Sequence, residues 1–174
     1  IAECRRVMGR GPISVRWVDV NKGDDNNPNI RSRLVARQIR GPGEETVFAP
    51  TPPLETLRSI VSMAATDFPD QPKHVRDGSS DRRTQISAVD ISRAYFNAKV
   101  DESEPVYVEF PPEFGAAPGT CALLRQHMYG TRRAADGWQS EYSNSLIELG
   151  FTQGTSSACV FLHAERHIMV SVHG

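Results

Sequence analysis

The sequence predicts an α+β fold, in which an antiparallel sheet carries helices packed on one face. Two observations support this class. Several short apolar stretches alternate with polar residues at the period of two typical of β-strands, and hairpin-like loops join neighbouring stretches. Two longer stretches instead carry apolar residues three and four positions apart, the spacing of one helix face. Together these elements indicate an α+β domain.

The N-terminal part predicts a β-hairpin. Strands are expected at residues 13–20 and 30–39, and the polar residues 21–29 between them supply the Gly, Asp, Asn and Pro that a hairpin loop needs. The Gly-Pro-Gly sequence at 41–43 ends the second strand.

A helix is expected to begin near Thr51, where prolines in the first turn are tolerated. Its apolar stripe consists of Leu54, Leu57, Val61 and Ala64. Residues 67–69 end it, and the polar residues 69–84 predict an exposed loop. A further strand is expected at 85–89, which would deliver Asp90 to its end.

The C-terminal half predicts shorter strands around a second helix. Strands are expected at 106–110 and 121–125, after an acidic loop at 101–104. Asp136 is predicted to cap a helix with the stripe Trp138, Tyr142, Leu146 and Leu149, and Gly150 stands at its C-terminal cap. Residues 158–162 and 168–172 predict a hairpin.

Composition describes an ordinary soluble globular protein, with 24% charged and 39% hydrophobic residues in 174. The net charge of −1 gives no overall attraction to nucleic acid, so any such binding requires a local patch. Three cysteines without a CxxC pair favour buried reduced thiols. Because no apolar run reaches membrane-spanning length and no signal-peptide pattern is present, no membrane association is expected.

Asp90 is the leading candidate for chemistry. A carboxylate at the end of a core strand is costly unless a cation or hydrogen-bond donors satisfy it. The residues that follow include small Ala94 and bulky Tyr95, which places an aromatic ring beside the carboxylate. Such a ring can lie under a nucleotide sugar and exclude a 2'-hydroxyl by steric rejection. The alternatives are a simple turn cap for Asp90 and core packing for Tyr95.

Arginines gather in the second predicted strand, at Arg31, Arg33, Arg37 and Arg40. Strand alternation places the first three on one face, where guanidinium groups suit a triphosphate or a nucleic-acid backbone. A solvated strand face is the alternative. His163 and His167 have the spacing of a zinc pair, but an exposed hairpin tip is the simpler interpretation.

A series of short blocks occurs in a fixed order across most of the chain. They are RWV at 16–18, RSRLVAR at 31–37, FAP at 48–50, LETLR at 54–58, VDISRAYFN at 89–97, VYVE at 106–109, PPEF at 111–114, CAL at 121–123, MYG at 128–130, Trp138, LGF at 149–151 and ACVF at 158–161. Together these collinear blocks resemble the reverse transcriptase domain of copia-type LTR retrotransposon polyproteins.

The resemblance implies two-metal nucleotidyl transfer, in which a primer 3'-hydroxyl attacks the α-phosphate of a dNTP and pyrophosphate leaves. Asp90 resembles the first metal-binding aspartate of a site for two Mg²⁺ ions, which Mn²⁺ can replace, and the Ile91 carbonyl would face the second ion. Tyr95 resembles the steric gate, and Ala94 lies where backbone meets the sugar. Arg33, with Arg31 or Arg37, is similar to the residues that hold the triphosphate.

The sequence also departs from the family. Two adjacent aspartates usually follow an apolar run such as 168–174, and we expect them just past Gly174. Because the chain opens with Ile1 instead of a methionine and stops directly after this run, we expect both ends to be cut. Asp90 alone is expected to hold divalent ions poorly. Arg133 stands where the family has a glutamine that contacts template or dNTP, which predicts a nucleic-acid contact. The loop at 69–84 is longer than the usual link.

We therefore expect fingers-like residues 1–85, with hairpin, helix and long loop, and palm-like residues 86–174, truncated at the C-terminal hairpin. The predicted function is part of a retrotransposon RNA-directed DNA polymerase, with this fragment inactive alone. Implied partners are an RNA or DNA template-primer, dNTP, and the remaining Pol polyprotein with integrase and RNase H. The alternative is a non-catalytic remnant that at most binds nucleic acid. The sequence shows no targeting signal that would predict a location. The resemblance implies either cytoplasmic particles or the nucleus.

Overall fold

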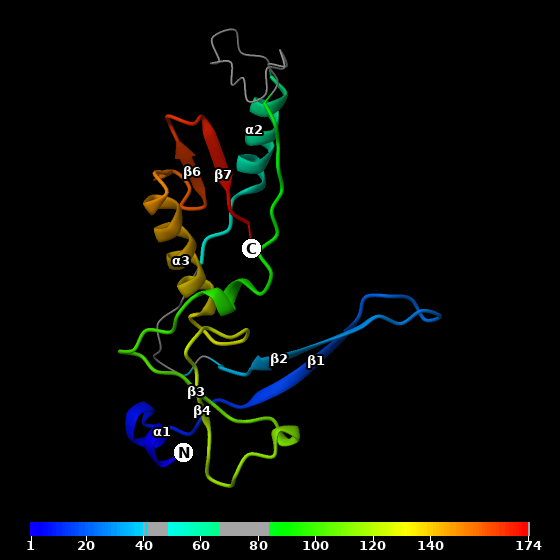
Figure 1. Ribbon diagram of the computed structural model, residues 1–174, viewed down its shortest axis with the longest axis vertical. Helices are drawn as coiled ribbons and strands as arrows, with labels where there is room; N and C mark the ends of the chain where they lie inside the picture. The colour runs from blue at the N-terminus through cyan, green and yellow to red at the C-terminus, as the bar shows by residue number, and fades with distance from the viewer. Residues whose placement is uncertain (40, 42–48, 67–83, 174) are drawn as a thin grey trace. The chain divides into compact units, whose positions relative to one another are not determined.

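A computed structural model of the protein describes residues 1–39, 41, 49–66 and 84–173, and these form a mixed α+β structure (Figure 1). The chain divides into two compact units, one comprising Ile1–Ala49 and Ser92–Tyr142 and the other Pro50–Ile91 and Ser143–Gly174. Within the described residues the strands form three small antiparallel sheets, where the sequence predicted one. None of the helices in this part of the chain is long and apolar enough to cross a membrane.

A two-stranded hairpin of β1 (Val15–Asn21) and β2 (Ile30–Ala36) belongs to the first unit, as the sequence predicted (Figure 1). Its loop is closed by Asn21, whose Oδ1 accepts from the backbone N–H groups of Gly23 at 2.9 Å and Asn29 at 2.8 Å. The predicted extension of the second strand to residue 39 is wrong. The backbone N–H of Arg37 still donates to Ser14 O, in register with β1. The ladder ends there because the next residue on the opposite side, Ile13, bonds to Tyr107 and Glu109 instead.

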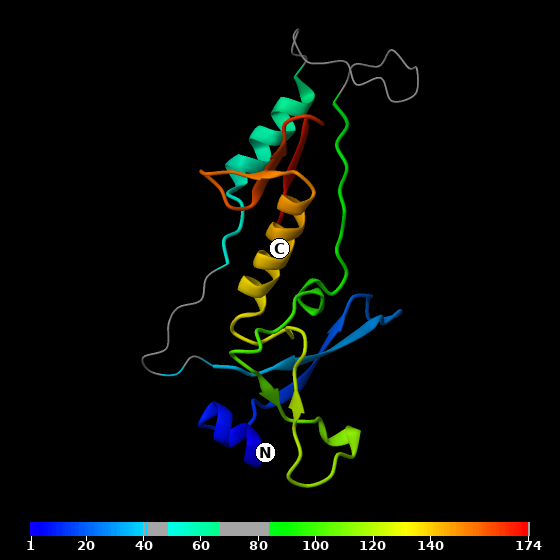
Figure 2. The ribbon, with the colours of Figure 1, turned by 60° about the vertical axis from the view of Figure 1, so that its left-hand side comes forward.

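The core of the first unit lies where the hairpin meets β3 (Tyr107–Val108) and β4 (Ala122–Leu123), which lie side by side in Figure 2. Its buried residues are Ile13, Ala36, Val108 and Met128. Ile13 joins the hairpin to β3, since its N–H donates to Tyr107 O and its carbonyl accepts from Glu109. Both short strands fall inside the predicted ranges, but each is only two residues long.

A short N-terminal helix, α1 (Ala2–Met8), was not predicted. It buries Cys4, whose Sγ lies 3.5 Å from the Arg10 carbonyl. Burial raises the pKa of the Cys4 thiol, and the neighbouring Cys121 raises it further, so this thiol stays protonated near neutral pH. Cys4 and Cys159 are buried and Cys121 is half-buried, all three as free cysteines.

Helix α3 (Ala134–Glu148) begins two residues before the predicted cap, Asp136. The carbonyl of Arg133 accepts the first helical hydrogen bond, from Gly137 at 2.8 Å. Asp136 therefore lies in the first turn, where a carboxylate is favoured by the helix dipole. The predicted C-terminal glycine is confirmed: Gly150 has φ 91° and its N–H donates to Ile147 O.

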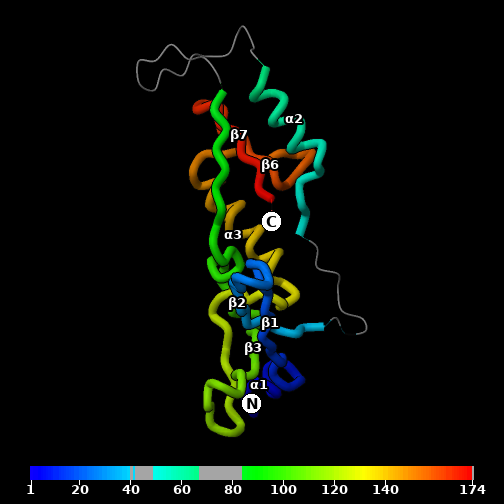
Figure 3. Tube along the Cα trace, turned by 90° about the vertical axis from the view of Figure 1, so that its right-hand side faces the viewer, coloured from blue at the N-terminus to red at the C-terminus, as the bar shows by residue number. Residues whose placement is uncertain are grey.

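The second unit contains a three-stranded sheet of β5 (Thr152–Gln153), β6 (Val160–His163) and β7 (Ile168–Ser171), which Figure 3 shows in orange and red. The predicted C-terminal hairpin is thus confirmed. Phe161 and Cys159 are fully buried, and the Cys159 thiol donates to Pro50 O at 3.0 Å. The predicted exposed histidine tip is wrong for His163, which is buried in β6 with its ring edge-to-face against Phe151. His167 lies exposed in the turn.

The first predicted helix is also confirmed, as α2 (Leu54–Ala65). Its apolar stripe is not covered within the described chain, because Leu54, Leu57 and Val61 are between 44% and 55% exposed. The strand predicted at 85–89 is wrong. Residues 84–90 are extended without a ladder partner among the described residues, and Val89 is 85% exposed. Arg40 and most of the predicted 69–84 loop lie outside the described residues.

Candidate functional site

A single 3₁₀ turn, η1 (Ala94–Asn97), follows Asp90 and projects two aromatic side chains. The turn is entered through Arg93, which has φ 56°, a left-handed conformation that costs a non-glycine residue about 1–3 kcal/mol. Asn97 offsets this strain by donating from Nδ2 to the carbonyls of Arg93 and Ala94, each at 3.3 Å. The tight aromatic turn that the sequence predicted is therefore present, held by a left-handed residue and an asparagine.

The rings of this turn lie against Tyr129. The Tyr95 ring centroid is 4.6 Å from that of Tyr129 at an interplanar angle of 45°, and the Phe96 centroid is 5.7 Å away with its ring edge-on. The Cζ atom of Arg33, from β2, lies 5.9 Å from the Tyr129 centroid over the ring face. Tyr129 thus joins the predicted gate residue to the predicted phosphate-binding arginine. Sequence reasoning quoted Tyr129 only as part of a matching block and gave it no role.

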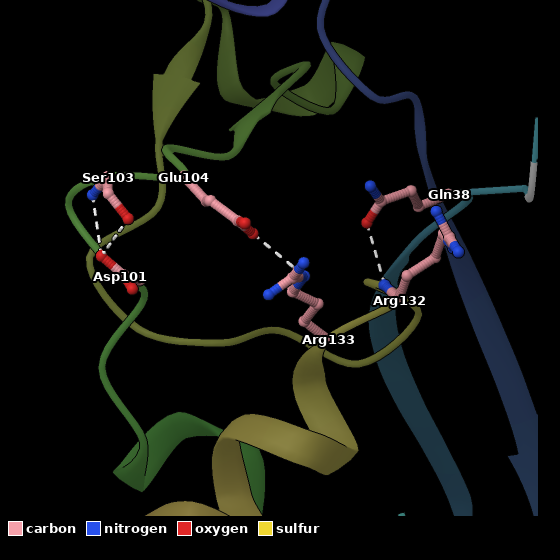
Figure 4. Close-up of polar contacts among 6 residues, drawn as sticks. All are labelled: Gln38, Asp101, Ser103, Glu104, Arg132 and Arg133. Atoms are coloured by element: carbon pink, nitrogen blue, oxygen red, sulfur yellow. Dashed lines mark hydrogen bonds and ion pairs between the residues drawn. The ribbon is translucent and has the colours of Figure 1, made fainter. Parts of the chain in front are cut away.

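The segment carrying Tyr129 is bound to the end of β2. The N–H of Ala36 donates to Tyr129 O at 2.8 Å, and that of Gln38 to Gly130 O at 3.2 Å. The Gln38 side chain extends the contact by accepting from the Arg132 N–H at 2.9 Å (Figure 4). Gly130 has φ 84°, and a Cβ there would collide with the Ala36 carbonyl oxygen. Glycine is therefore required for this backbone approach.

The arginines of β2 share a face with the opposite strand. Because directly paired residues of an antiparallel ladder point the same way, Arg31 and Arg33 lie on one face with Val20 and Val18. Arg16, which pairs with Val35, adds a cation to this face that sequence reasoning did not assign.

Arg37 falls one residue past β2, and its guanidinium Nε donates to Ser14 Oγ at 3.0 Å. The face that Arg37 is predicted to share with Arg31 and Arg33 stays a prediction, because Arg37 lies one residue past the paired strand, opposite Ser14. Arg37 still lines a shallow depression together with Arg16, Val18, Val35, Gln38 and Gly130. Three arginines, at positions 16, 31 and 33, consequently form the basic face of β1 and β2.

Arg133 is held by the acidic loop. Its Nε lies 3.0 Å from Glu104 Oε2, and both side chains are about half exposed, at 52% and 50% (Figure 4). Within the same loop Asp101 accepts from the backbone N–H and hydroxyl of Ser103, at 2.8 and 2.7 Å. These two hydrogen bonds, with a smaller contribution from Arg133, hold the pKa of Asp101 below its usual range. The exposed ion pair is worth about 0–1 kcal/mol, so it limits Arg133 only weakly.

A buried histidine lies beneath the start of α3. His127 is 6% exposed, its Nδ1 has no hydrogen-bond partner among the described residues, and a Cβ at Gly137 would collide with its ring. Burial lowers the pKa of His127, partly opposed by the charge of Asp136, so the imidazole is neutral at physiological pH. Its backbone N–H donates to Ala98 O at 2.8 Å, just past the aromatic turn.

Asp90 and Ile91 belong to the second unit, whereas Arg33, Ala94, Tyr95 and Arg133 belong to the first. Asp90 and Ile91 are exposed, Ile91 by 50%, and neither extends a strand in the described structure. Asp90 is therefore not a carboxylate at the end of a core strand. In the part of the chain that the structure describes, no three His, Cys, Asp or Glu residues are grouped as a metal site.

A basic strand face beside an aromatic turn is the arrangement expected of a domain that binds nucleotides or nucleic acid. Comparison with known families gives the class: the model described as "Reverse transcriptase (RNA-dependent DNA polymerase)" matches residues 5–173. The chain therefore belongs to the reverse transcriptase family. Members of this family generally use divalent metal ions.

Individual relatives point the same way. The chain is similar to the retrovirus-related Pol polyprotein from transposon RE1 of Arabidopsis thaliana, with 24% identity over 86% of this chain and 10% of that protein. It is also similar to the one from transposon TNT 1-94 of Nicotiana tabacum, with 23% identity over 88% of this chain and 11% of that protein. The chain thus spans about a tenth of these curated relatives. No solved structure matches it significantly. The resemblance to retrotransposon reverse transcriptases is confirmed.

Proposed function

We propose that this chain is part of an RNA-directed DNA polymerase of a retrotransposon, in which the first unit binds the incoming dNTP. The observation that carries this proposal is the contact of Tyr129 with both Tyr95 and Arg33. A guanidinium that binds phosphate oxygens and a ring that lies under the sugar must act on one nucleotide. Their contacts with one common neighbour support the proposal that both groups act on the same nucleotide.

Each group suits its part of a nucleotide. Arg33 is exposed, and stacking on a ring face leaves the N–H donors in the guanidinium plane for phosphate oxygens. Arg31 lies on the same strand face and adds charge, while Arg37 borders the adjoining depression. Tyr95 is half-buried, and we propose that it excludes a 2'-hydroxyl, with the Ala94 backbone beside the sugar. Arg133 would contact template or primer.

The metal site fits this chain only in part. Two Mg²⁺ ions require several oxygen ligands. The described residues that the family resemblance assigns to the metal site are one exposed carboxylate, Asp90, and the neighbouring carbonyl of Ile91, and no group of three possible ligands lies among the described residues. These groups alone do not form a two-ion site, so we derive no catalytic step from them. We propose that Asp90 contributes one carboxylate in the complete protein. Residues 1–85 would serve as fingers and 86–174 as palm.

The test is primer extension on an RNA template by the full-length protein containing this chain, with Asp90→Asn as the variant. Mutation of the groups that hydrogen-bond to a metal ligand lowers metal affinity or activity by about 10- to 100-fold, and loss of the ligand itself should cost at least as much. We therefore expect primer extension to fall by about 100-fold or more. Asp101→Asn is the control, because that exposed carboxylate is bound to Ser103 instead. An Asp90→Asn protein that extends primers as well as the parent would overturn the assignment.

One observation favours a second function, a non-catalytic remnant that only binds nucleic acid. Arg16, Arg31 and Arg33 form a basic face that needs no metal to attract phosphate. This alternative predicts RNA binding that weakens steeply with salt, without metal-dependent turnover. Extension by the parent protein would exclude it.

A further inference from the structure

We propose that Tyr129 is a positioning residue, whose ring fixes the Tyr95 gate and the Arg33 guanidinium relative to each other. This inference rests on the proposed function and goes beyond it. It assigns to one side chain the control of the distance between the ring that selects the sugar and the guanidinium that binds phosphate. The centroid of the Tyr129 ring lies 4.6 Å from that of Tyr95, 5.7 Å from that of Phe96 and 5.9 Å from the Cζ atom of Arg33.

The backbone around Tyr129 links the two elements that carry these groups. On one side, the His127 N–H donates to the carbonyl of Ala98, whose own N–H donates to Tyr95 O. On the other side, Ala36 at the end of β2 donates to Tyr129 O at 2.8 Å. Residues 127–130 therefore bridge the aromatic turn and β2 by main-chain hydrogen bonds. The segment that carries Tyr129 is thus bound on both sides.

The ring is placed for selectivity more than for core stability. The described core of this unit consists of Ile13, Ala36, Val108 and the neighbouring Met128, whereas Tyr129 is half-buried outside it. The contacts use the ring itself: a tilted aromatic pair with Tyr95 and a cation over its face. A phenylalanine would preserve both contacts. A leucine would fill similar volume without a π face, and so it would release Arg33 and the gate.

The experiment measures steady-state primer extension by the full-length protein with dTTP and with 5-methyluridine triphosphate, which differs from dTTP only by its 2'-hydroxyl. For Tyr129→Leu we expect the KM for dTTP to rise roughly tenfold and the preference for dTTP over this ribonucleotide to fall, with kcat at saturating dTTP nearly unchanged. Tyr129→Phe should retain parental values. The matched control is Phe110→Leu, which removes a ring from the stacked pair of Phe110 and Phe114 elsewhere in the unit.

A double-variant cycle protects the test against a simple folding defect. If Tyr129 holds Arg33, then Arg33→Ala should raise the KM for dTTP much less in Tyr129→Leu than in the parent. Two results would overturn the positioning role: additive effects of Arg33→Ala and Tyr129→Leu on the KM, or an unchanged KM and sugar preference in Tyr129→Leu. Neither result would contradict the proposed function, as long as the parent protein extends primers. Equal losses in Tyr129→Leu and Tyr129→Phe would also overturn the positioning role, by placing the effect on the hydroxyl. A parent that extends no primer would refute the proposed function first, and this inference with it.

Discussion

The two units of this chain differ in how much of the expected site they assemble. In the first unit, side chains distant in sequence, from β2, the aromatic turn and the segment 127–130, contact one another around Tyr129. In the second unit, Asp90 lies in an exposed extended segment without a partner among the described residues. The groups proposed to bind a nucleotide thus contact one another within the described residues, whereas the carboxylate proposed to bind metal has no such contacts there. We therefore expect nucleotide binding and metal binding to depend on different parts of the protein.

The largest effect should come from breaking the backbone contact of the first unit with Gly130→Ala. The added Cβ would collide with the Ala36 carbonyl oxygen at a residue with φ 84°, so we expect a loss of about 3 kcal/mol or more in the free energy of unfolding. Urea unfolding of the chain measures it.

Gly119→Ala is the matched control for this change. Gly119 also has a positive φ, 81°, but a Cβ there meets nothing within 4 Å. Gly119→Ala should therefore lower the free energy of unfolding only by the conformational cost of a left-handed residue, about 1–2 kcal/mol. If both variants lost the same free energy of unfolding, the close approach of Gly130 to β2 would contribute nothing to stability.

A moderate effect should follow from pH through His127. Because the pKa of the folded imidazole is lowered by burial, the unfolded chain binds a proton near pH 6.5, where the folded chain does not. The contribution of His127 to stability should be constant above about pH 7.5 and decrease as the pH falls through 6.5, by up to about 1.4 kcal/mol per pH unit until the lowered pKa is reached. Unfolding between pH 7.5 and 5.5 tests this, and His127→Gln should show a shallower slope. Identical slopes would exclude His127 as the source.

The sequence predicted local elements well where their signals are local. The polar loop at 21–29, the stripe of α2 and the glycine at 150 each depend on a few neighbouring residues, and each is present. The sequence predicted separate roles for Arg33 and Tyr95 and no common neighbour for them. Tyr129 was missed because its role arises from contacts with residues 33 and 95, which no spacing in the sequence reveals. Helix α1 was missed because its seven residues are too few for a periodic pattern.

The boundary errors have physical causes too. Residues 37–39 continue the alternation of β2, but the backbone of Ile13 on the opposite side bonds to Tyr107 and Glu109 instead of to them. Alternation alone cannot identify such a partner. Residues 85–89 alternate as a strand does, yet a strand exists only where a second edge accepts its hydrogen bonds. His163 looked like a loop residue because it is polar, whereas the ring of Phe151 and the fold of β6 bury it.

The smallest effect is expected in the second unit and tests the comparison most directly. Val89→Ala should change the free energy of unfolding by less than about 0.5 kcal/mol, because Val89 is 85% exposed. The same substitution in the first unit, Val108→Ala, removes core volume from a side chain that is 4% exposed and should cost about 2 kcal/mol. Both values come from urea unfolding of the chain. If Val89→Ala matched Val108→Ala, residues 85–89 would be covered in solution after all. Asp90 would then lie at the end of a paired strand, as the sequence first indicated.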